Sequence, residues 1–112
     1  MIETVLLNYL NSANLSATVY MEQPKDKPDT FYVLEKTGGD KTNHINESNF
    51  IVQSNALSLA GAAEMNEEIK TAMFNAITLD EISRVELNGD YNYTDSATKQ
   101  YRYQAVFVIT HY

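Results

Sequence analysis

The feature that most constrains the fold is a pair of helix-like segments set among strand-like ones. Apolar residues recur at every third or fourth position near the start of the chain and again in its middle, which is the period of one helix face. The first stripe is Ile2, Val5, Leu6, Tyr9, Leu10 and Ala13, and the second is Ala62, Met65, Ile69, Ala72, Met73 and Ala76. We therefore predict one helix that stops near Asn14 and a second over Ser58–Ile77.

Between and after these two segments, apolar and polar residues alternate, which is the period of a strand with one buried face. We expect a first strand within Leu15–Glu22, followed by a charged connector with two prolines, Gln23–Asp29, that a central strand would not tolerate. Phe31–Thr37 has the composition of a second strand, and the Gly38–Asp40 segment after it is predicted to be a turn. A third strand is expected within His44–Ser54.

The third expected strand alternates imperfectly. Polar Glu47 and Asn49 share a parity with apolar Ile51, so one face of a regular strand would mix charged and apolar side chains. A β-bulge midway would reverse the faces of all residues beyond it, and a change of environment along the strand would have a similar effect. We expect one of these two irregularities.

The last third of the chain returns to strand composition. A strand over Ile82–Tyr93 is predicted to contain a bulge or a turn at Asn88–Asp90, and Thr94–Lys99 is predicted to be the tip of a hairpin. The closing strand has two distinct faces: Tyr101, Tyr103, Ala105, Phe107 and Ile109 on one, and Arg102, Gln104, Val106, Val108 and Thr110 on the other.

The resulting order of elements is α-β-β-β-α-β-β. With 112 residues the chain has the length of one domain, which we assign to residues 1–112. Helices and strands that are segregated in this way indicate an α+β fold. We predict a mainly antiparallel sheet with two helices packed on one of its faces.

Composition restricts the environment of the protein. The chain has no cysteine, which excludes disulfides, thiolate metal sites and cysteine nucleophiles. Its longest apolar run, Ala105–Ile109, is far too short to span a bilayer. The chain begins Met-Ile-Glu-Thr, without the basic and apolar regions of a signal peptide. We therefore expect a protein that stays in a cytosol-like compartment and has no membrane partner.

The charge balance disfavours specific DNA binding. The chain has 15 acidic and 8 basic residues, for a net charge of −7. Affinity for phosphate comes from clustered Lys and Arg, and the few basic residues here are scattered. A sequence-reading DNA-binding domain is not expected, although an acidic wall that nucleic acid passes without binding remains compatible with this composition.

Every candidate for a chemical site in the sequence is incomplete. The two histidines, His44 and His111, have no other good ligand three or four positions away, and no Gly-x-Ser-x-Gly motif is present. Gly38–Thr42 resembles the end of a phosphate-binding loop, and Asp90–Asp95 resembles the start of a calcium loop, but in each an aspartate stands where glycine is needed. We predict no catalytic residues, no cofactor and no metal site, and a protein that is not an enzyme.

Three features of the composition each have two interpretations. Glu64, Glu67 and Glu68 cluster on the second helix, either as a solvated face or as a patch that repels nucleic acid or attracts a basic partner. Near the start of the second helix, Gly61 leaves little side-chain bulk, which suits close packing on the sheet or the close approach of another molecule. Eight tyrosines, five of them after position 90, suit both strands and protein interfaces.

Three phrases, together with the order of elements, carry a resemblance to a known family. They are Phe31–Gly39 (FYVLEKTGG), Phe50–Ala63 (FIVQSNALSLAGAA) and Tyr101–His111 (YRYQAVFVITH), and Gln53-Ser54-x-Ala56-x-Ser58 is the most specific piece. The chain resembles, end to end, the tail terminator (tail completion, head-tail joining) proteins of long-tailed bacteriophages, particularly those of Gram-positive hosts. One departure is Gly61-Ala62-Ala63, where the family pattern has a glutamate followed by alanine.

The resemblance implies a structural virion protein without catalytic residues. It implies a homo-oligomeric ring, hexameric in the virion, that caps the completed tail tube, stops its polymerisation and joins the tail to the head. Its implied partners are its own copies, the major tail tube protein and a head completion or connector protein, at the head-tail junction after assembly in the host cytoplasm. DNA would pass through the ring without specific binding. Ring subunits meet through two different surfaces, and Pro24–Asp29, Thr37–His44 and Thr94–Lys99 are candidate contact segments.

Two other classes of function stay open. A small acidic inhibitor or immunity-type protein would also be compact and without catalytic residues, and would bind one basic partner as a monomer. A small hydrolase or ligand-binding domain would need a pocket lined by convergent polar residues. No such set is apparent in the sequence.

Overall fold

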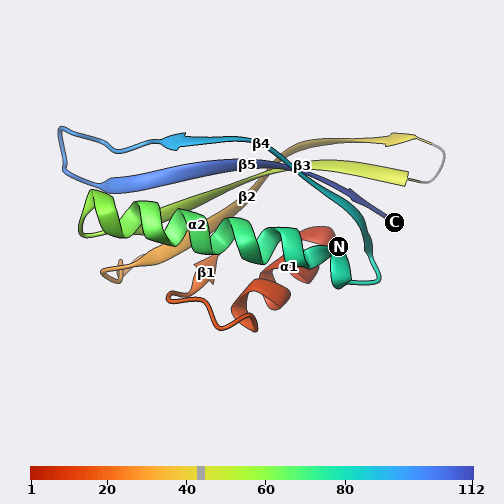
Figure 1. Cartoon of the computed structure of the whole chain (residues 1–112), viewed down its shortest axis with the longest axis horizontal. Helices are drawn as coiled ribbons and strands as arrows, with labels where there is room; N and C mark the ends of the chain where they lie inside the picture. The colour runs from red at the N-terminus through yellow and green to blue at the C-terminus, as the bar shows by residue number, and fades with distance from the viewer. Residues whose placement is uncertain (43–44) are drawn as a thin grey trace.

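The computed structural model describes residues 1–42 and 45–112 as a five-stranded sheet with both α-helices on one of its faces (Figure 1). The helices are α1 (Ile2–Asn11), α2 (Leu59–Asn75) and the 3-10 helix η1 (Ala76–Thr78); the strands are β1 (Val19–Tyr20), β2 (Phe31–Thr42), β3 (Ile45–Ala56), β4 (Ile82–Asn92) and β5 (Tyr101–His111). In space the strands follow the order β1-β2-β3-β5-β4. The β1–β2 pair is parallel and the other pairs are antiparallel, so the predicted α+β class and element order are confirmed.

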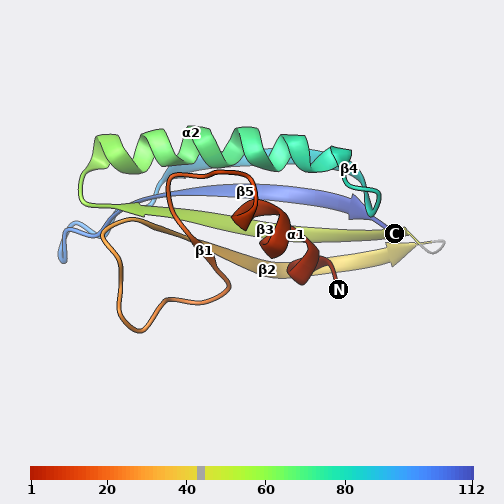
Figure 2. The same ribbon diagram turned by 90° about the horizontal axis from the view of Figure 1, so that it is seen from below.

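The core lies between the sheet and the two helices. α2 contacts β3 and β5, whereas α1 contacts β1 and β2 (Figure 2). The predicted stripe of α2 is fully or nearly buried, and β5 presents Ala105, Phe107 and Ile109 to it. α1 buries Ile2, Leu6 and Leu10 and ends at Asn11, and Asn14 adopts a left-handed φ of 57° soon afterwards. Both predicted helices are thus confirmed.

The start of α2 explains its lack of side-chain bulk. Ser58 caps the helix, since its Oγ accepts a hydrogen bond of 3.0 Å from the Gly61 N–H. A Cβ on Gly61 would lie 3.0 Å from the Ser58 Oγ and 3.3 Å from the Cβ of Ala56, the last residue of β3. The helix cap and close packing on the sheet therefore account for the glycine.

The first predicted strand is much shorter than expected. Only Val19–Tyr20 of Leu15–Glu22 pairs with the sheet. The alternation before it has another cause: Leu15 and Ala17 pack against the core. Between them, Ser16 donates from its N–H and its Oγ to the Glu68 carboxylate at 2.6 and 2.8 Å, which holds this segment against α2. At the other end of the segment, Asn11 of α1 bonds the backbone N–H and C=O of Val19.

The predicted turn at Gly38–Asp40 is wrong, because these residues continue β2. The register shifts between Lys36 and Gly38, which leaves Thr37 as the extra residue of a bulge. A Cβ on Gly39 would lie only 2.8 Å from the Glu47 carbonyl oxygen, so the glycine permits a close approach of two strands rather than a turn.

Of the two irregularities expected in β3, a bulge or a change of environment, the structure shows the second. β3 pairs with β5 without a register shift. Its helix-side face consists of Ser48, Phe50, Val52 and Ser54. Glu47 and Asn49 are exposed on the other face, where Ile51 is half-buried. The change of environment arises because the core side of β3 includes two serines, while no helix covers its opposite side.

The last two strands form the predicted hairpin. β5 is an inner strand between β3 and β4. β4 has register shifts at Ser83 and at Asn88, and Gly89 there has a φ of 139°, so the expected irregularity at Asn88–Asp90 is a bulge. Beyond β4, a bridge between Asp95 and Gln100 closes the hairpin tip.

Candidate functional site

The face of the sheet opposite the helices carries a row of hydrogen-bonded polar side chains. Gln53 of β3 donates to Gln104 of β5 at 3.0 Å, and Gln104 donates to the hydroxyl of Tyr91 in β4. Gln23, from the loop after β1, donates to Gln53 at 3.5 Å. Register places Gln53, Gln104 and Tyr91 directly beside one another, so the row runs across three strands. This open face is therefore ordered although no helix covers it.

Aromatic side chains flank the row at the β4 side. The rings of Tyr91 and Tyr93 meet edge to face with centroids 5.9 Å apart, and both are exposed. Arg102 lies over Tyr93, with its Cζ 4.7 Å from the ring centroid, and its Nε donates to the Tyr93 carbonyl at 2.7 Å. Exposed tyrosines with an ordered arginine are typical of protein interfaces.

Two of the three predicted contact segments come together at one end of the molecule. Lys27, Pro28 and Asp29 of the first segment and Lys99 of Thr94–Lys99 line a shared cleft of about 200 Å³. The hairpin tip Thr94–Lys99 and the far end of the β2–β3 hairpin lie at opposite ends of the 45 Å long axis (Figure 1). Of the predicted segment Thr37–His44, residues 37–42 belong to β2, and His44 lies outside the described residues.

The fold brings together one serine–histidine pair that the sequence spacing did not indicate. Ser48 Oγ and His111 Nε2 are 2.7 Å apart, and His111 Nδ1 faces the Tyr112 carbonyl at 3.3 Å. Ser48 is only 2 % exposed, and it lies with His111 at the wall of an open cleft that is also lined by Gly38–Lys41 of β2. The hydrogen bond satisfies two largely buried polar groups, which is the ordinary role of such a pair.

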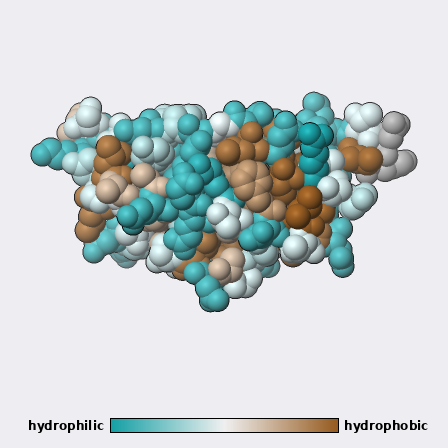
Figure 3. Space-filling view, viewed as in Figure 1, coloured by the Kyte–Doolittle hydropathy of each residue, from teal (hydrophilic) through white to brown (hydrophobic). Residues whose placement is uncertain are grey.

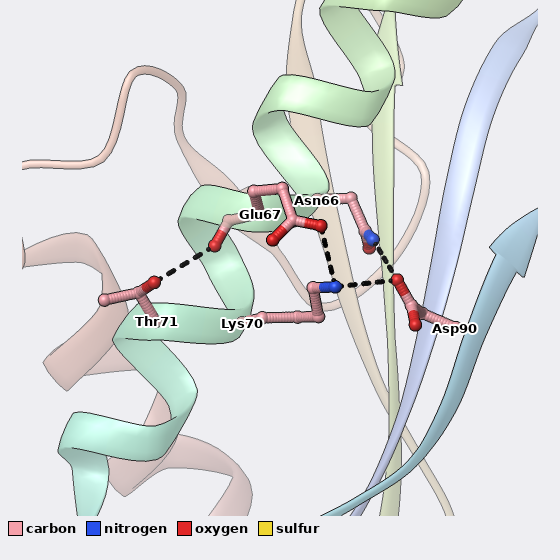
Figure 4. Close-up of polar contacts among 5 residues, drawn as sticks. All are labelled: Asn66, Glu67, Lys70, Thr71 and Asp90. Carbon is pink, nitrogen blue, oxygen red and sulfur yellow. Dashed lines mark hydrogen bonds and ion pairs between the residues drawn. The ribbon is translucent and has the colours of Figure 1, made fainter.

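The acidic cluster on α2 divides into side chains with different roles. Glu64 is exposed. Glu67 pairs with Lys70 at 2.8 Å, and Lys70 also reaches Asp90 of β4 at 2.9 Å (Figure 4). Glu68 holds the segment before β1, as described above. Of the two interpretations of this cluster, the solvated helix face therefore applies to only part of it.

Lys70, Asp90 and Asn66 form a clasp between α2 and β4. Asp90 Oδ2 accepts from both Lys70 and Asn66, the latter at 2.6 Å. The hydrogen bond from Lys70 lowers the pKa of Asp90 below its ordinary 3.8. The hydrogen bond to Glu67, followed by that to Asp90, raises the pKa of Lys70. Both shifts favour the charged pair that links the helix to the last strand of the sheet.

The clasp gives a pH-dependent prediction. We expect Asp90→Asn to lower the free energy of unfolding at pH 7 by about 1–2 kcal/mol, because Lys70 and Asn66 lose a charged acceptor. A carboxylate with a lowered pKa contributes its stability above its ordinary pKa of 3.8 and loses it as the pH falls below that value. Urea titrations should therefore show a difference from the unsubstituted protein that shrinks toward pH 3.

Glu86→Gln is the matched control for the clasp. Glu86 pairs with Arg84 at 3.4 Å, but both side chains are at least half exposed, and such pairs contribute little. Equal destabilisation by Asp90→Asn and Glu86→Gln would mean that the clasp contributes no more to the free energy of unfolding than an exposed ion pair.

No cation site or membrane-spanning element is found in the described part of the chain. Over residues 1–42 and 45–112, no three histidine or acidic side chains gather closely enough to hold a metal ion. Neither α-helix in these ranges combines the length and apolar character needed to cross a membrane. No model of a known protein family matches the chain, and no curated protein is similar to it in sequence.

Proposed function

We propose that this chain is a tail terminator of a long-tailed bacteriophage: a ring-forming virion protein that caps the tail tube, stops its polymerisation and joins tail to head. The observation that carries the proposal is where the three family-like phrases fall. Phe31–Gly39 and Tyr101–His111 lie in β2 and β5, and Phe50–Ala63 runs from β3 through the Ser58 cap into α2. The resemblance therefore follows three neighbouring strands and one helix start, the framework of the fold.

The shape of the molecule supports a role in assembly. A ring of identical subunits needs two different contact surfaces on each subunit. The sheet has two different outer strands, β4 on one side and β1 with β2 on the other. Hairpins at both ends of the long axis and an ordered open face provide further surfaces for a tube and a head protein.

The distribution of charge supports passage of DNA through such a ring. The net charge is −7, and several cations already have partners within the chain. Lys70 is held by Glu67 and Asp90, and Arg102 lies on Tyr93. The remaining basic side chains are outnumbered by the 15 acidic residues of the chain, and we propose that DNA passes without specific binding.

Elongation of tail tubes tests the proposal. Tubes polymerised from the major tail tube protein of the same phage should stop growing when this protein is added, and electron micrographs should show one capped end. Tubes of unchanged length with bare ends would contradict it. The inhibitor alternative differs, because it predicts a monomer at every concentration by light scattering, with no binding to tubes.

A further inference from the structure

The sheet has two free edges that lie at the same level. β1 pairs only with Tyr32 and Val33, so in the described residues the outer edge of β2 is unpaired beyond Val33. No strand among these residues pairs with the outer edge of β4. Register across the sheet places Asp40 of β2 in one row with Arg84 of β4, by way of Glu47 and Thr110. The free part of β2 is therefore level with Ile82–Asp90 of β4.

Charges on the two edges are complementary on both faces of the sheet. On the open face, acidic Asp40 is level with basic Arg84. On the helix face, exposed Lys41 is level with Ile82, which directly follows the exposed acids Asp80 and Glu81. Opposite charges on neighbouring strands attract and like charges repel. Pairing of β2 with β4 at this level would therefore bring opposite charges together.

An apolar patch lies beside the β4 edge on the helix face. Phe74 is 43 % exposed and Ile77 is 51 % exposed, next to the half-buried side chains of Val85 and Leu87. Figure 3 shows hydrophobic atoms gathered between the C-terminal half of α2 and β4. α2 lies mainly over β3 and β5, whereas β4 is contacted chiefly by η1. A further element on this side would bury the patch.

From these observations we infer that neighbouring copies meet edge to edge, with the free part of β2 of one copy pairing antiparallel to β4 of the next. β2 and β4 run in opposite directions within one chain, so copies of the same orientation placed side by side would pair in this way. The occupant of the apolar patch is then the next copy, whose α1 lies on its β1–β2 side. The inference rests on the proposed ring and specifies its subunit contact.

The bulges and charges of the two edges agree with a selective contact. Edge strands commonly carry such features to prevent indiscriminate pairing. In β4 the bulges at Ser83 and Asn88 leave Arg84–Leu87 as a regular stretch between them. In β2 the bulge at Thr37 is followed by the regular stretch Gly38–Thr42. These two short regular stretches carry complementary charges, so they can pair with each other. A strand from an unrelated protein would not match both the charges and the bulges.

Site-specific cross-linking tests the contact, because the chain has no cysteine of its own. We would prepare Asp40→Cys, Arg84→Cys and the double variant, and treat each on tail tubes with a thiol cross-linker of about 8 Å reach. Within one copy the two positions are three strand spacings apart, about 14 Å, which exceeds that reach. Between edge-paired copies they are neighbours, with tolerance for a register shift of one or two residues. Glu64→Cys with Arg84→Cys is the control, since Glu64 is exposed on α2, away from the β2 edge.

The expected result is a ladder of cross-linked species up to the full ring for the double variant only. Single variants and the control pair should stay monomeric on denaturing gels. Dimers from a single variant, or no ladder from a double variant that still caps tubes, would overturn the edge contact and leave the proposed function intact. Failure of the unsubstituted protein to cap tubes would instead remove the proposed function itself.

If the cysteine variants no longer cap tubes, an exchange of the charges at the two positions provides a second test. Asp40→Arg alone and Arg84→Asp alone should each weaken assembly on tubes at least tenfold, and combining them should restore it. Each variant should keep the melting temperature of the unsubstituted protein, because both positions are exposed. Equal capping by all three variants, or no recovery in the combination, would contradict the pairing.

Discussion

Phe107→Ala is expected to leave little folded protein. Phe107 is fully buried in the inner strand β5, pairs with Phe50 and Leu87 across the sheet, and meets the Phe74 ring edge to face at 6.3 Å. Removing its ring leaves a cavity between the sheet and α2, at a cost of about 3–5 kcal/mol. The total free energy of unfolding of a domain of this size is about 5–15 kcal/mol. Urea denaturation followed by circular dichroism should show a much lower midpoint or no folded baseline.

Val108→Ala is the control for the loss of buried volume. Val108 is the next residue of β5, but it is half-buried on the open face and no helix lies over it. Losing two methyl groups at such a position should cost about 1 kcal/mol. Comparable destabilisation by the two substitutions would show that the core does not lie between β5 and α2.

Gly39→Ala is expected to destabilise the β2–β3 hairpin, whereas Gly38→Ala is not. A Cβ at position 39 would lie 2.8 Å from the Glu47 carbonyl oxygen, so the two strands would have to separate locally, at a cost of about 1–3 kcal/mol. At position 38 the nearest atom would be Asn49 Nδ2 at 3.7 Å, an ordinary contact. Alanine there also reduces the freedom of the unfolded chain, which favours folding slightly.

The paired substitutions separate the two explanations of the double glycine. If the glycines formed a turn, both alanine variants would be affected through the backbone. The structure instead predicts a loss of stability for Gly39→Ala alone, measured by thermal unfolding. Equal melting temperatures for the two variants would contradict the close strand approach.

The elements that follow local patterns could be predicted from the sequence. Both helices show an apolar stripe at the helix period, and Ser58 is a standard N-terminal cap, so their positions depend on neighbouring residues only. The closing strand was predicted to have two distinct faces, and Ala105, Phe107 and Ile109 of one face are buried in the core. Such a pattern shows which side of an element is buried. The apolar sides of both helices and of β5 face the same core.

Features that depend on distant partners could not be predicted. The segment before β1 alternates like a strand, but Glu68, 52 residues later, takes the hydrogen bonds that a strand partner would make. The double glycine looks like a turn because its actual cause, the Glu47 carbonyl, comes from the facing strand. Local sequence does not identify the partner in either case.

The candidate site was even less accessible to sequence reasoning. Gln53 and Gln104 both lie opposite the core side of their strands, which was a visible signal for a polar open face. Their direct contact depends on the register between β3 and β5, and the contact of Gln104 with Tyr91 depends on the β4 bulge at Asn88. Register and bulges are set by the whole sheet.

In the function that we propose, identical copies of this chain form a ring at the end of a tail tube. The number of copies bound per tube end can be counted from end-on averages in electron microscopy together with the mass of the bound assembly. We expect six copies in a closed ring at one end of each tube. Single copies, or copies distributed along the tube wall, would contradict it.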